Sequence, residues 1–469
     1  MMYTIKNKIS IFFLLIVVLI GNASCKDSDG TDTTNKEVNT WIENTMRENY
    51  LWYEDIPVAN KLNFKNDPGT FFTSLLSDND GKDYSSGGGH FYYSYIKDTS
   101  ASANTRSISQ IDYSYGFDFI LYSINDTAYA ARILYVASDS PASEAGLERG
   151  DWIITMGGEY ITAGNYSTLD GGSAMKLHLA SYSSSLNKLI YSKYMQLGTA
   201  REIEDDPVYY SNTYTYTVNG KKVGYLVYNH FTASEDEEKG DEKYNKELLA
   251  LSKEFKTEGV TDFILDLRYN NGGLLTCAQL LSSILAPESV FGNTFCKLEY
   301  NDKQSPQTEE LNFSSSTISS GANLDLSTVY VLVSDNTASA SELVINALKP
   351  YANVVLIGTK TEGKNVGSVS YTDKKYTWKL QPIVCKLYNA NGESDYVSGF
   401  SPDYTCDETE TIEHWKPFGD TDELLLSTAL SLIGGTYSAA TVATTRSTLN
   451  LKRVACSLDR KADNAVIIR

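Results

Sequence analysis

The chain has 469 residues, which is enough for two to four domains and a large buried core. Its formal net charge is −19, with 40 basic and 59 acidic residues, and this balance argues against a nucleic-acid partner, which needs clustered Lys and Arg. After Cys25 there are five cysteines, none with the spacing of a metal site and none with an obvious partner: Cys277, Cys296, Cys385, Cys406 and Cys456.

The N-terminal residues 1–24 have the pattern of a signal peptide. Lys6 and Lys8 precede the apolar stretch Ile11–Ile20, which is too short to span a bilayer. Cys25 follows small residues in a pattern that resembles the lipobox of bacterial lipoproteins, in which this cysteine is lipidated. We therefore expect a protein of the cell envelope that is lipid-anchored to the outer membrane, with residues 25–40 as a polar tether.

Two smaller regions follow the tether. In residues 41–106, apolar side chains such as Trp41, Ile42 and Met46 recur at three- and four-residue steps, which predicts an N-terminal helical domain. In residues 107–205, Ser140 is a suitable N-cap and Gly146 a suitable C-terminal stop, so a short helix is predicted there. The strand Trp152–Met156 then follows.

The region 107–205 resembles a PDZ domain of the bacterial, circularly permuted kind. The residues Tyr115, Gly116 and Phe117 stand where that family has its carboxylate-binding loop. PDZ domains bind a peptide as an additional strand at a sheet edge, so the resemblance implies a peptide-binding module. The alternative is that this module serves only as a packing wing.

Residues 206–435 alternate strands with helices, which predicts an α/β layer. The buried strands Phe263–Leu267 and Val329–Val333 lead respectively to the Gly272-Gly273 turn and to Ser339. Active groups in such sheets lie at the carboxyl ends of the strands. Residues 436–469 are predicted to be a C-terminal extension.

Ser339 and Lys364 are separated by a predicted helix and a returning strand, an arrangement that can bring them together. A serine hydroxyl needs a neighbouring base to become a good nucleophile, and a lysine held neutral by burial can be that base. Ser339 at a helix start also places a developing oxyanion near the positive end of the helix dipole.

The order of four motifs resembles the C-terminal processing (tail-specific) peptidase family: Asp266–Gly273, Ser339–Glu342, Gly363-Lys364 and Gly399–Asp403. The resemblance implies a crotonase-like α/β protease core, with Ser339 as nucleophile and Lys364 as general base. It also implies a backbone oxyanion hole at Ala340, Gly272 and Gly273. Two positions depart from the family pattern. Ser368 stands where some members have a Gln that orients the lysine, and Pro350 stands where others have an Asp. Glu342 is our candidate for positioning Lys364.

Each of these residues also has a purely structural interpretation. The pattern Ser339-x-x-Glu342 is a capping box, and an isolated lysine is usually exposed. His230 lacks an Asp partner at recognisable spacing, so a structural role is expected. Asp266, inside an apolar strand, is expected to brace Arg268 or the turn.

The sequence therefore predicts a multidomain α/β protein that acts as an exported serine endopeptidase on peptides or unfolded proteins, with a Ser-Lys dyad. This chemistry requires no cofactor and no metal. Two alternatives stay open: a surface lipoprotein that binds peptides without cutting them, and an assembly role in an envelope complex. The sequence does not give the oligomeric state.

Overall fold

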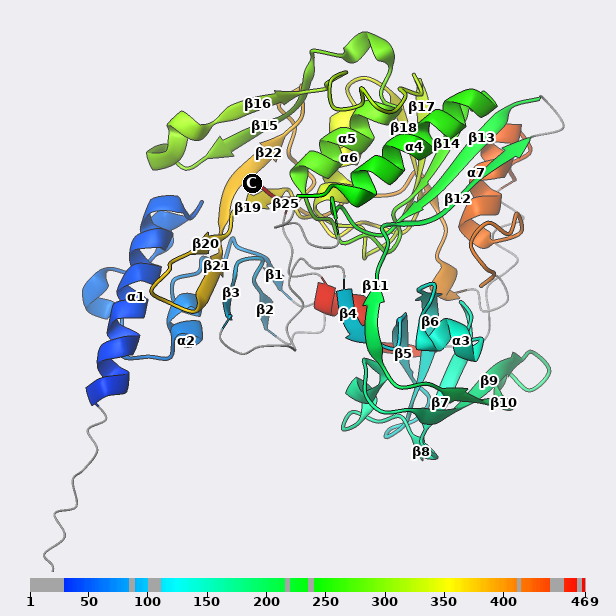
Figure 1. The fold of residues 1–469 in the computed structure, drawn as a ribbon, viewed down its shortest axis with the longest axis horizontal. Helices are drawn as coiled ribbons and strands as arrows, with labels where there is room; N and C mark the ends of the chain where they lie inside the picture. The colour runs from blue at the N-terminus through cyan, green and yellow to red at the C-terminus, as the bar shows by residue number, and fades with distance from the viewer. Residues whose placement is uncertain are drawn as a thin grey trace, which may run out of the picture.

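The computed structural model describes residues 29–83, 89–99, 111–215, 220–234, 240–410, 415–438, 451–461 and 466–468. It is a mixed α/β protein in which an N-terminal module and a β-rich wing lie against a larger layered core (Figure 1). Cys25 and the linker around residues 101–106 lie outside the described residues.

The N-terminal module begins with α1 (Asp29–Asn49), which starts within the stretch predicted to be a tether. Val38, Ile42 and Met46 recur at four-residue steps and are buried, so this helix has an apolar face that reaches into the predicted tether. After α2 (Pro68–Thr73) the module is not helical as predicted but contains β1 (Lys82–Asp83), β2 (His90–Phe91) and β3 (Tyr95–Asp98).

The wing is a mainly antiparallel sheet with the strand order β10-β9-β7-β6-β5-β24. Its elements, in chain order, are β4 (Ile111–Ser114), β5 (Phe117–Ser123), β6 (Tyr129–Val136), α3 (Pro141–Ala145), β7 (Trp152–Met156), β8 (Glu159–Tyr160), β9 (Met175–Ser183), β10 (Lys188–Leu197) and β11 (Arg201–Glu204). The predicted helix is confirmed: Ser140 accepts the amide of Ser143, and Gly146 ends the helix with φ 78°.

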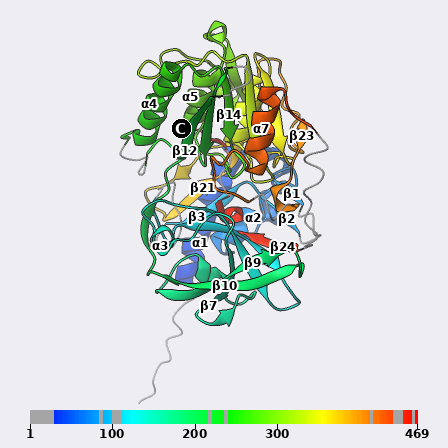
Figure 2. The ribbon, with the colours of Figure 1, turned by 90° about the vertical axis from the view of Figure 1, so that its right-hand side faces the viewer.

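The core is a six-stranded sheet that is parallel except for its first strand. Its strands, in spatial order, are β12 (Val208–Thr215), β13 (Lys222–Tyr228), β14 (Asp262–Asp266), β17 (Thr328–Val333), β18 (Asn353–Gly358) and β23 (Tyr404–Thr405). The helices α4 (Lys243–Glu258), α5 (Leu275–Leu285) and α6 (Ala340–Leu348) cover one face, and α7 (Leu424–Gly434) covers the other (Figure 2). The predicted α/β layer is thus confirmed.

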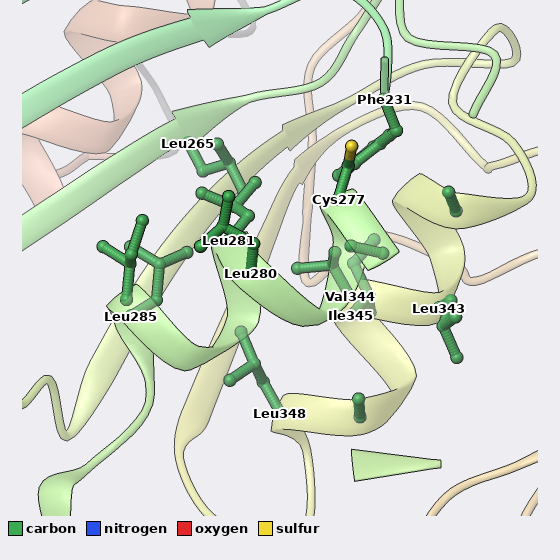
Figure 3. Packing of buried hydrophobic residues seen from close by; sticks show 14 of the residues in the cluster. Phe231, Leu265, Cys277, Leu280, Leu281, Leu285, Leu343, Val344, Ile345 and Leu348 are labelled. Atoms are coloured by element: carbon green, nitrogen blue, oxygen red, sulfur yellow. The ribbon is translucent and has the colours of Figure 1, made fainter. Parts of the chain in front are cut away.

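Helix α6, which begins directly after Ser339, is held in place by apolar packing. Figure 3 shows Val344, Ile345 and Leu348 lying beside Leu280 and Leu281 of α5. All nine residues of α6 are buried. The helix therefore sits between its sheet and its neighbouring helix, which fixes the position of its first turn.

A second sheet has the order β16-β15-β22-β19-β25 and lies next to the N-terminal module. Its strands are β15 (Thr294–Tyr300), β16 (Glu309–Asn312), β19 (Val366–Ser368), β22 (Ile383–Tyr388) and β25 (Val466–Ile467). A separate three-stranded sheet consists of β20 (Tyr371–Thr372), β21 (Trp378–Gln381) and β3. Strand β3 pairs with β21 and so attaches the N-terminal module to this part of the core.

The segment predicted to be a C-terminal extension contributes a strand to each of two sheets. β24 (Lys452–Cys456) pairs with β5 of the wing, and β25 pairs with β19 of the second sheet. Sequence position suggested an appendage, but the buried residues Cys456, Val466 and Ile467 make this segment part of the folded body.

The wing is joined to the core by a buried cluster of charges. Arg149 of the wing donates to the Glu408 carboxylate at 2.7 Å, and Arg268 of the core donates to the same Oε2 atom at 2.7 Å. Arg268 also binds Asp266 and Glu423, at 2.8 and 2.7 Å. Burial acts to raise the pKa of Glu408, but the guanidinium groups of Arg149 and Arg268 lower it to about 2. The carboxylate therefore stays ionised and ties wing to core.

Among the described residues, no helix combines the length and the apolar character needed to cross a membrane. The cysteines Cys277, Cys296, Cys385, Cys406 and Cys456 are all buried and unpaired.

We expect Glu408→Gln to destabilise the protein by about 3–5 kcal/mol, because it leaves two buried guanidinium groups without their shared counter-charge. Urea unfolding followed by fluorescence would measure this. The matched control is Glu37→Gln, which breaks the exposed ion pair with Lys375 and should change the stability by less than about 1 kcal/mol. Equal effects of the two substitutions would contradict the role given to the buried cluster.

Candidate active site

Ser339 lies at the N-terminus of α6 in a strained backbone conformation. Its φ is 61° and its ψ is −114°, a region that residues with a side chain rarely adopt. The residue is fully buried, and its Oγ has no hydrogen-bond partner among the described residues. A buried hydroxyl is normally paired, so this one stands out in a site that also has a strained backbone.

Glu342 connects the backbone of Ser339 with that of Lys364. Its Oε2 atom accepts the amide of Ser339 at 3.0 Å and the amide of Lys364 at 2.8 Å. Its Oε1 atom accepts the amide of Gly363 at 2.7 Å and the hydroxyl of Thr361 at 2.6 Å. One oxygen atom thus holds the two predicted catalytic segments side by side. The capping box expected for Ser339-x-x-Glu342 is present, with Glu342 accepting the amide of Ser339.

The Glu342 carboxyl group is fully buried, and its ionisation reflects two opposing effects. Burial raises its pKa from 4.5 to about 7, while the hydrogen bonds from Thr361 and from the amides of Lys364, Gly363 and Ser339 act to lower it. Burial is the larger of the two effects, so the pKa stays raised although four donors converge on the two oxygens.

The Gly272-Gly273 turn lies directly against Ser339. A Cβ atom on Gly272 would come within 2.6 Å of the Ser339 Cβ and 2.9 Å of the Ala340 nitrogen, so only glycine allows this approach. The Gly272 amide donates to Asn270 Oδ1 at 2.8 Å. Here the structure differs from the predicted oxyanion hole, because the Asn270 side chain folds back over the turn and engages one of the three proposed donors.

Lys364 is buried, with 1% of its surface exposed, and its Nζ lies 4.6 Å from the centre of the Tyr93 ring. Tyr93 belongs to the N-terminal module, where the Asp80 carboxylate accepts its amide at 3.0 Å and the Tyr50 hydroxyl at 2.9 Å. Tyr93 was not among the site residues predicted from the sequence. Its only sequence signal was the run of three aromatic residues at 91–93, far from Lys364 along the chain.

The two departures from the family pattern have different surroundings. The Ser368 hydroxyl accepts from Gln381 Nε2 at 2.9 Å, so this residue braces the second sheet. Pro350 lies in the turn after α6. The two residues expected to be structural are so in the structure. His230 Nε2 lies 2.9 Å from the Asp205 carbonyl oxygen, and Asp266 binds the Arg268 guanidinium.

The loop Tyr115–Phe117, which is predicted to bind peptide, leads directly into strand β5 of the wing. Tyr115 and Phe117 are buried in the core of the wing, and Tyr115 donates its hydroxyl to the Ser173 carbonyl at 2.6 Å. Gly116 has φ 82° and lies against Ser140, where a Cβ would meet the Ser140 Cβ at 2.2 Å. The loop is therefore fixed tightly to the wing.

A cavity of about 650 Å³ lies between wing and core. It is lined by Arg132, Trp152, Asp335 and Glu408 among others, but by neither Ser339 nor Lys364.

The chain matches known proteins over most of this architecture. The profile of "Peptidase family S41" matches residues 222–406, and that of "Peptidase S41 N-terminal domain" matches residues 37–95. The crystal structure of a "Putative S41 protease" from Bacteroides fragilis NCTC 9343 is 39% identical, with a TM-score of 0.74, and the match covers 85% of this chain and 98% of that one. The chain belongs to peptidase family S41.

Two curated relatives match over shorter stretches. The "Probable CtpA-like serine protease" of Staphylococcus aureus (strain N315) is 30% identical over 182 residues, which are 37% of this chain and 34% of that protein. The "Carboxy-terminal processing protease CtpA" of Bacillus subtilis (strain 168) is 25% identical over 319 residues, which are 66% of this chain and 59% of that protein. The chain thus spans about a third of the length of the first of these relatives.

The raised pKa of Glu342 predicts a pH-dependent contribution to stability. The pKa of Glu342 is about 7 in the folded state and lies above the ordinary 4.5. Its contribution to the unfolding free energy is therefore fully present below about pH 4.5 and is lost as the pH rises through about 7. In Glu342→Gln this loss is absent. The advantage in unfolding free energy of the wild type over the variant should therefore shrink by up to about 3 kcal/mol between about pH 4 and 8. The unfolding free energies of both proteins would be measured by urea unfolding across this pH range. A constant difference between wild type and variant would contradict the raised pKa of Glu342.

Proposed function

We propose that this protein is an exported serine endopeptidase with a Ser339-Lys364 dyad, acting on peptides or unfolded proteins. The observation that carries the proposal is the shared Glu342 oxygen, which joins the Ser339 and Lys364 backbones beside an unpaired serine hydroxyl. Membership of peptidase family S41 supports the same reaction class. In this proposal the core is crotonase-like and the wing is a circularly permuted PDZ domain.

In the first half of the reaction, Ser339 Oγ attacks the scissile carbonyl carbon while Lys364 Nζ takes its proton. The negative charge that develops on the carbonyl oxygen is stabilised by two backbone amides, that of Ala340 at the start of α6 and that of Gly273 in the glycine turn. Lys364 then gives the proton to the leaving amine, which leaves an acyl group on Ser339.

In the second half, a water molecule attacks the acyl carbon and gives its proton to Lys364 Nζ. The same oxyanion donors stabilise the second tetrahedral intermediate, and its collapse frees the new carboxyl group and restores the Ser339 hydroxyl. Glu342 fixes the two backbone segments, and it is therefore a positioning residue rather than a proton carrier. No cofactor or metal takes part.

The Tyr93 ring gives Lys364 a second kind of support. Burial, with the carboxylates of Glu362 and Glu342, raises the pKa of Tyr93, so that its phenol stays neutral. The electron-rich face of a neutral ring stabilises an ammonium ion in a dry site. Lys364 becomes an ammonium ion when it takes the proton of Ser339, so Tyr93 favours the step that the reaction requires.

In our proposal the wing recruits substrate by binding its chain as a strand, with the loop Tyr115–Phe117 receiving the terminal carboxylate. A lipid on Cys25 would hold the enzyme at the outer membrane of the cell envelope. A competing function is that of a non-catalytic peptide-binding lipoprotein, which would need the same wing but neither Ser339 nor Lys364.

Removal of either dyad member should abolish turnover. We expect Ser339→Ala and Lys364→Ala each to lower kcat/KM by about 1,000-fold or more towards an unfolded protein and towards peptides with varied C-termini. His230→Gln is the matched control and should keep most of the activity, since His230 Nε2 lies 2.9 Å from the carbonyl oxygen of Asp205 and 3.8 Å from its carboxylate. Equal activity, or equal inactivity, of wild type and Ser339→Ala would favour the non-catalytic alternative.

The support from Tyr93 should appear in kcat. We expect Tyr93→Leu to lower kcat by about 10-fold with little change in KM, while Tyr93→Phe, which keeps the ring, stays near wild type. Without the ring the protonated lysine is less favoured, so the acid limb of the kcat/KM profile should move to lower pH in the Leu variant. If the Leu and Phe variants share one profile with the wild type, the ring has no such role.

A further inference from the structure

Two short segments near the end of the sequence add edge strands at the two places where a peptide substrate would bind. The first, β24, extends the wing sheet beside β5. The second, β25 with the following residue Ile468, lies beside β19 in the core. In Figure 1 the label of β25 stands next to that of β19, and in Figure 2 β24 lies over the wing.

At the wing, β24 occupies the edge that a peptide ligand would use. Strand β5 directly follows the loop Tyr115–Phe117, and β24 pairs with it antiparallel, so that Lys452 lies opposite Ser123 and Cys456 opposite Ile120. The segment therefore runs toward the loop, as a ligand with its C-terminal end at the loop would. Added strands of this kind bind through main-chain hydrogen bonds at an exposed sheet edge.

A side chain next to β24 strengthens this contact. The Ser457 hydroxyl accepts the amide of Phe119 at 2.8 Å and donates to Asp118 Oδ1 at 2.6 Å. Both partners belong to β5, two to three residues after Gly116. The segment thus satisfies a main-chain donor at the ligand edge of the wing.

In the core, β25 lies between the two halves of the candidate active site. Ile467 donates its amide to the Gly273 carbonyl at 3.0 Å, and Ile468 donates its amide to the Ser368 carbonyl at 3.0 Å. Gly273 belongs to the turn that lies against Ser339, and Ser368 belongs to the strand that follows Lys364. A substrate chain added beside either element would lie next to the segments that carry Ser339 and Lys364.

The slot that β25 fills is apolar and shaped for aliphatic side chains. Val466 and Ile467 are 0% and 3% exposed, and both belong to the main hydrophobic cluster of the core. Gly367 leaves room for the neighbouring chain, because a Cβ there would come within 2.8 Å of both Cys385 Sγ and Ile468 Cδ1. Such a slot selects an extended peptide with β-branched aliphatic residues.

We propose that Lys452–Cys456 and Val466–Ile468 form an intramolecular ligand that occupies both peptide-binding edges and blocks the enzyme until substrate displaces it. This inference rests on the proposed peptidase function. The complete burial of Ser339 agrees with a blocked state, and β25 is bound to the Gly273 carbonyl of the turn that lies against this residue. It also names the substrate class, an extended chain rich in valine and isoleucine.

The inference predicts that removal of the second segment activates the enzyme. Suppose that β25 fills the slot in about nine of ten full-length molecules, so that only about a tenth of them can bind substrate. A chain that ends at Lys461 should then have a kcat/KM at least about 10-fold higher than that of the full-length chain. The rate at which a fluorophosphonate labels Ser339 should rise by the same factor. Ile467→Asp, which places a charge in the apolar slot, should act in the same direction. Val58→Thr, at a position of the N-terminal module that is 58% exposed, is the matched control and should leave both rates unchanged.

A binding measurement separates this inference from the proposed catalysis. A fluorescent peptide with the sequence of residues 465–469 should bind to a Ser339→Ala chain that ends at Lys461, and binding to the Ser339→Ala full-length chain should be at least about 10-fold weaker. The same peptide with Asp in place of the residue corresponding to Ile467 should not bind. Equal binding to the short and full-length chains, or a short chain that is folded by circular dichroism yet labelled no faster than wild type, would overturn the inference. If neither chain turns over peptide but the binding difference is present, the proposed catalysis fails and the intramolecular ligand stands.

Discussion

The geometry of the candidate site depends on the Glu342 carboxylate. Its four hydrogen bonds join the first turn of α6 to the loop Thr361–Lys364, two segments that the chain connects only through a helix and a strand. Because the carboxylate is fully buried, each lost hydrogen bond would leave a charge or a donor unsatisfied in a dry environment. The strained φ of Ser339 persists for the same reason: its amide is bound by Glu342, while the apolar packing of α6 fixes the rest of the turn.

The buried charges around Arg268 give the wing a direct physical link to this site. Arg268 stands on the same short segment as Asn270, whose side chain holds the Gly272 amide. Arg149 of the wing shares the Glu408 carboxylate with Arg268 and also donates to the hydroxyl of Tyr269 at 2.6 Å. A shift of the wing therefore acts on the residues immediately before the glycine turn. Such a cluster is costly to break one partner at a time, which favours movement of wing and turn together.

Much of this arrangement could be predicted from the sequence, because it depends on local patterns. Alternating strands and helices predicted the α/β layer, and the cap residues Ser140 and Gly146 predicted the helix of the wing. The ordered motifs around Gly272, Ser339 and Lys364 carried the family resemblance. The contacts that the sequence did not reveal are those between distant segments. Tyr93 lies beside Lys364 in a module that pairs with the core through β3 and β21, a contact between segments far apart in the sequence.

The helix boundary at Asp29 was missed for another reason. The start of α1 is polar and resembles a tether, and its helical state depends on the apolar face that begins at Val38. The C-terminal segment was misjudged as an appendage for a related reason. Its strands have only five and two residues, which is too little sequence pattern to be recognised, and their stability comes from the sheet edges to which they add.

The same physical argument applies to both strands of the C-terminal segment, β24 and β25. An unpaired sheet edge exposes main-chain donors and acceptors, and a binding protein must keep such an edge available without letting it aggregate. If the edges of β5 and β19 bind substrate as proposed, charges or prolines cannot block them permanently. A short segment of the same chain could cover them reversibly, and each substrate would then have to compete with it. Because this segment pairs with both sheets, a long extended substrate could displace it at both places, whereas a short peptide would meet only one. The proposal therefore implies a preference for long unfolded chains over short fragments.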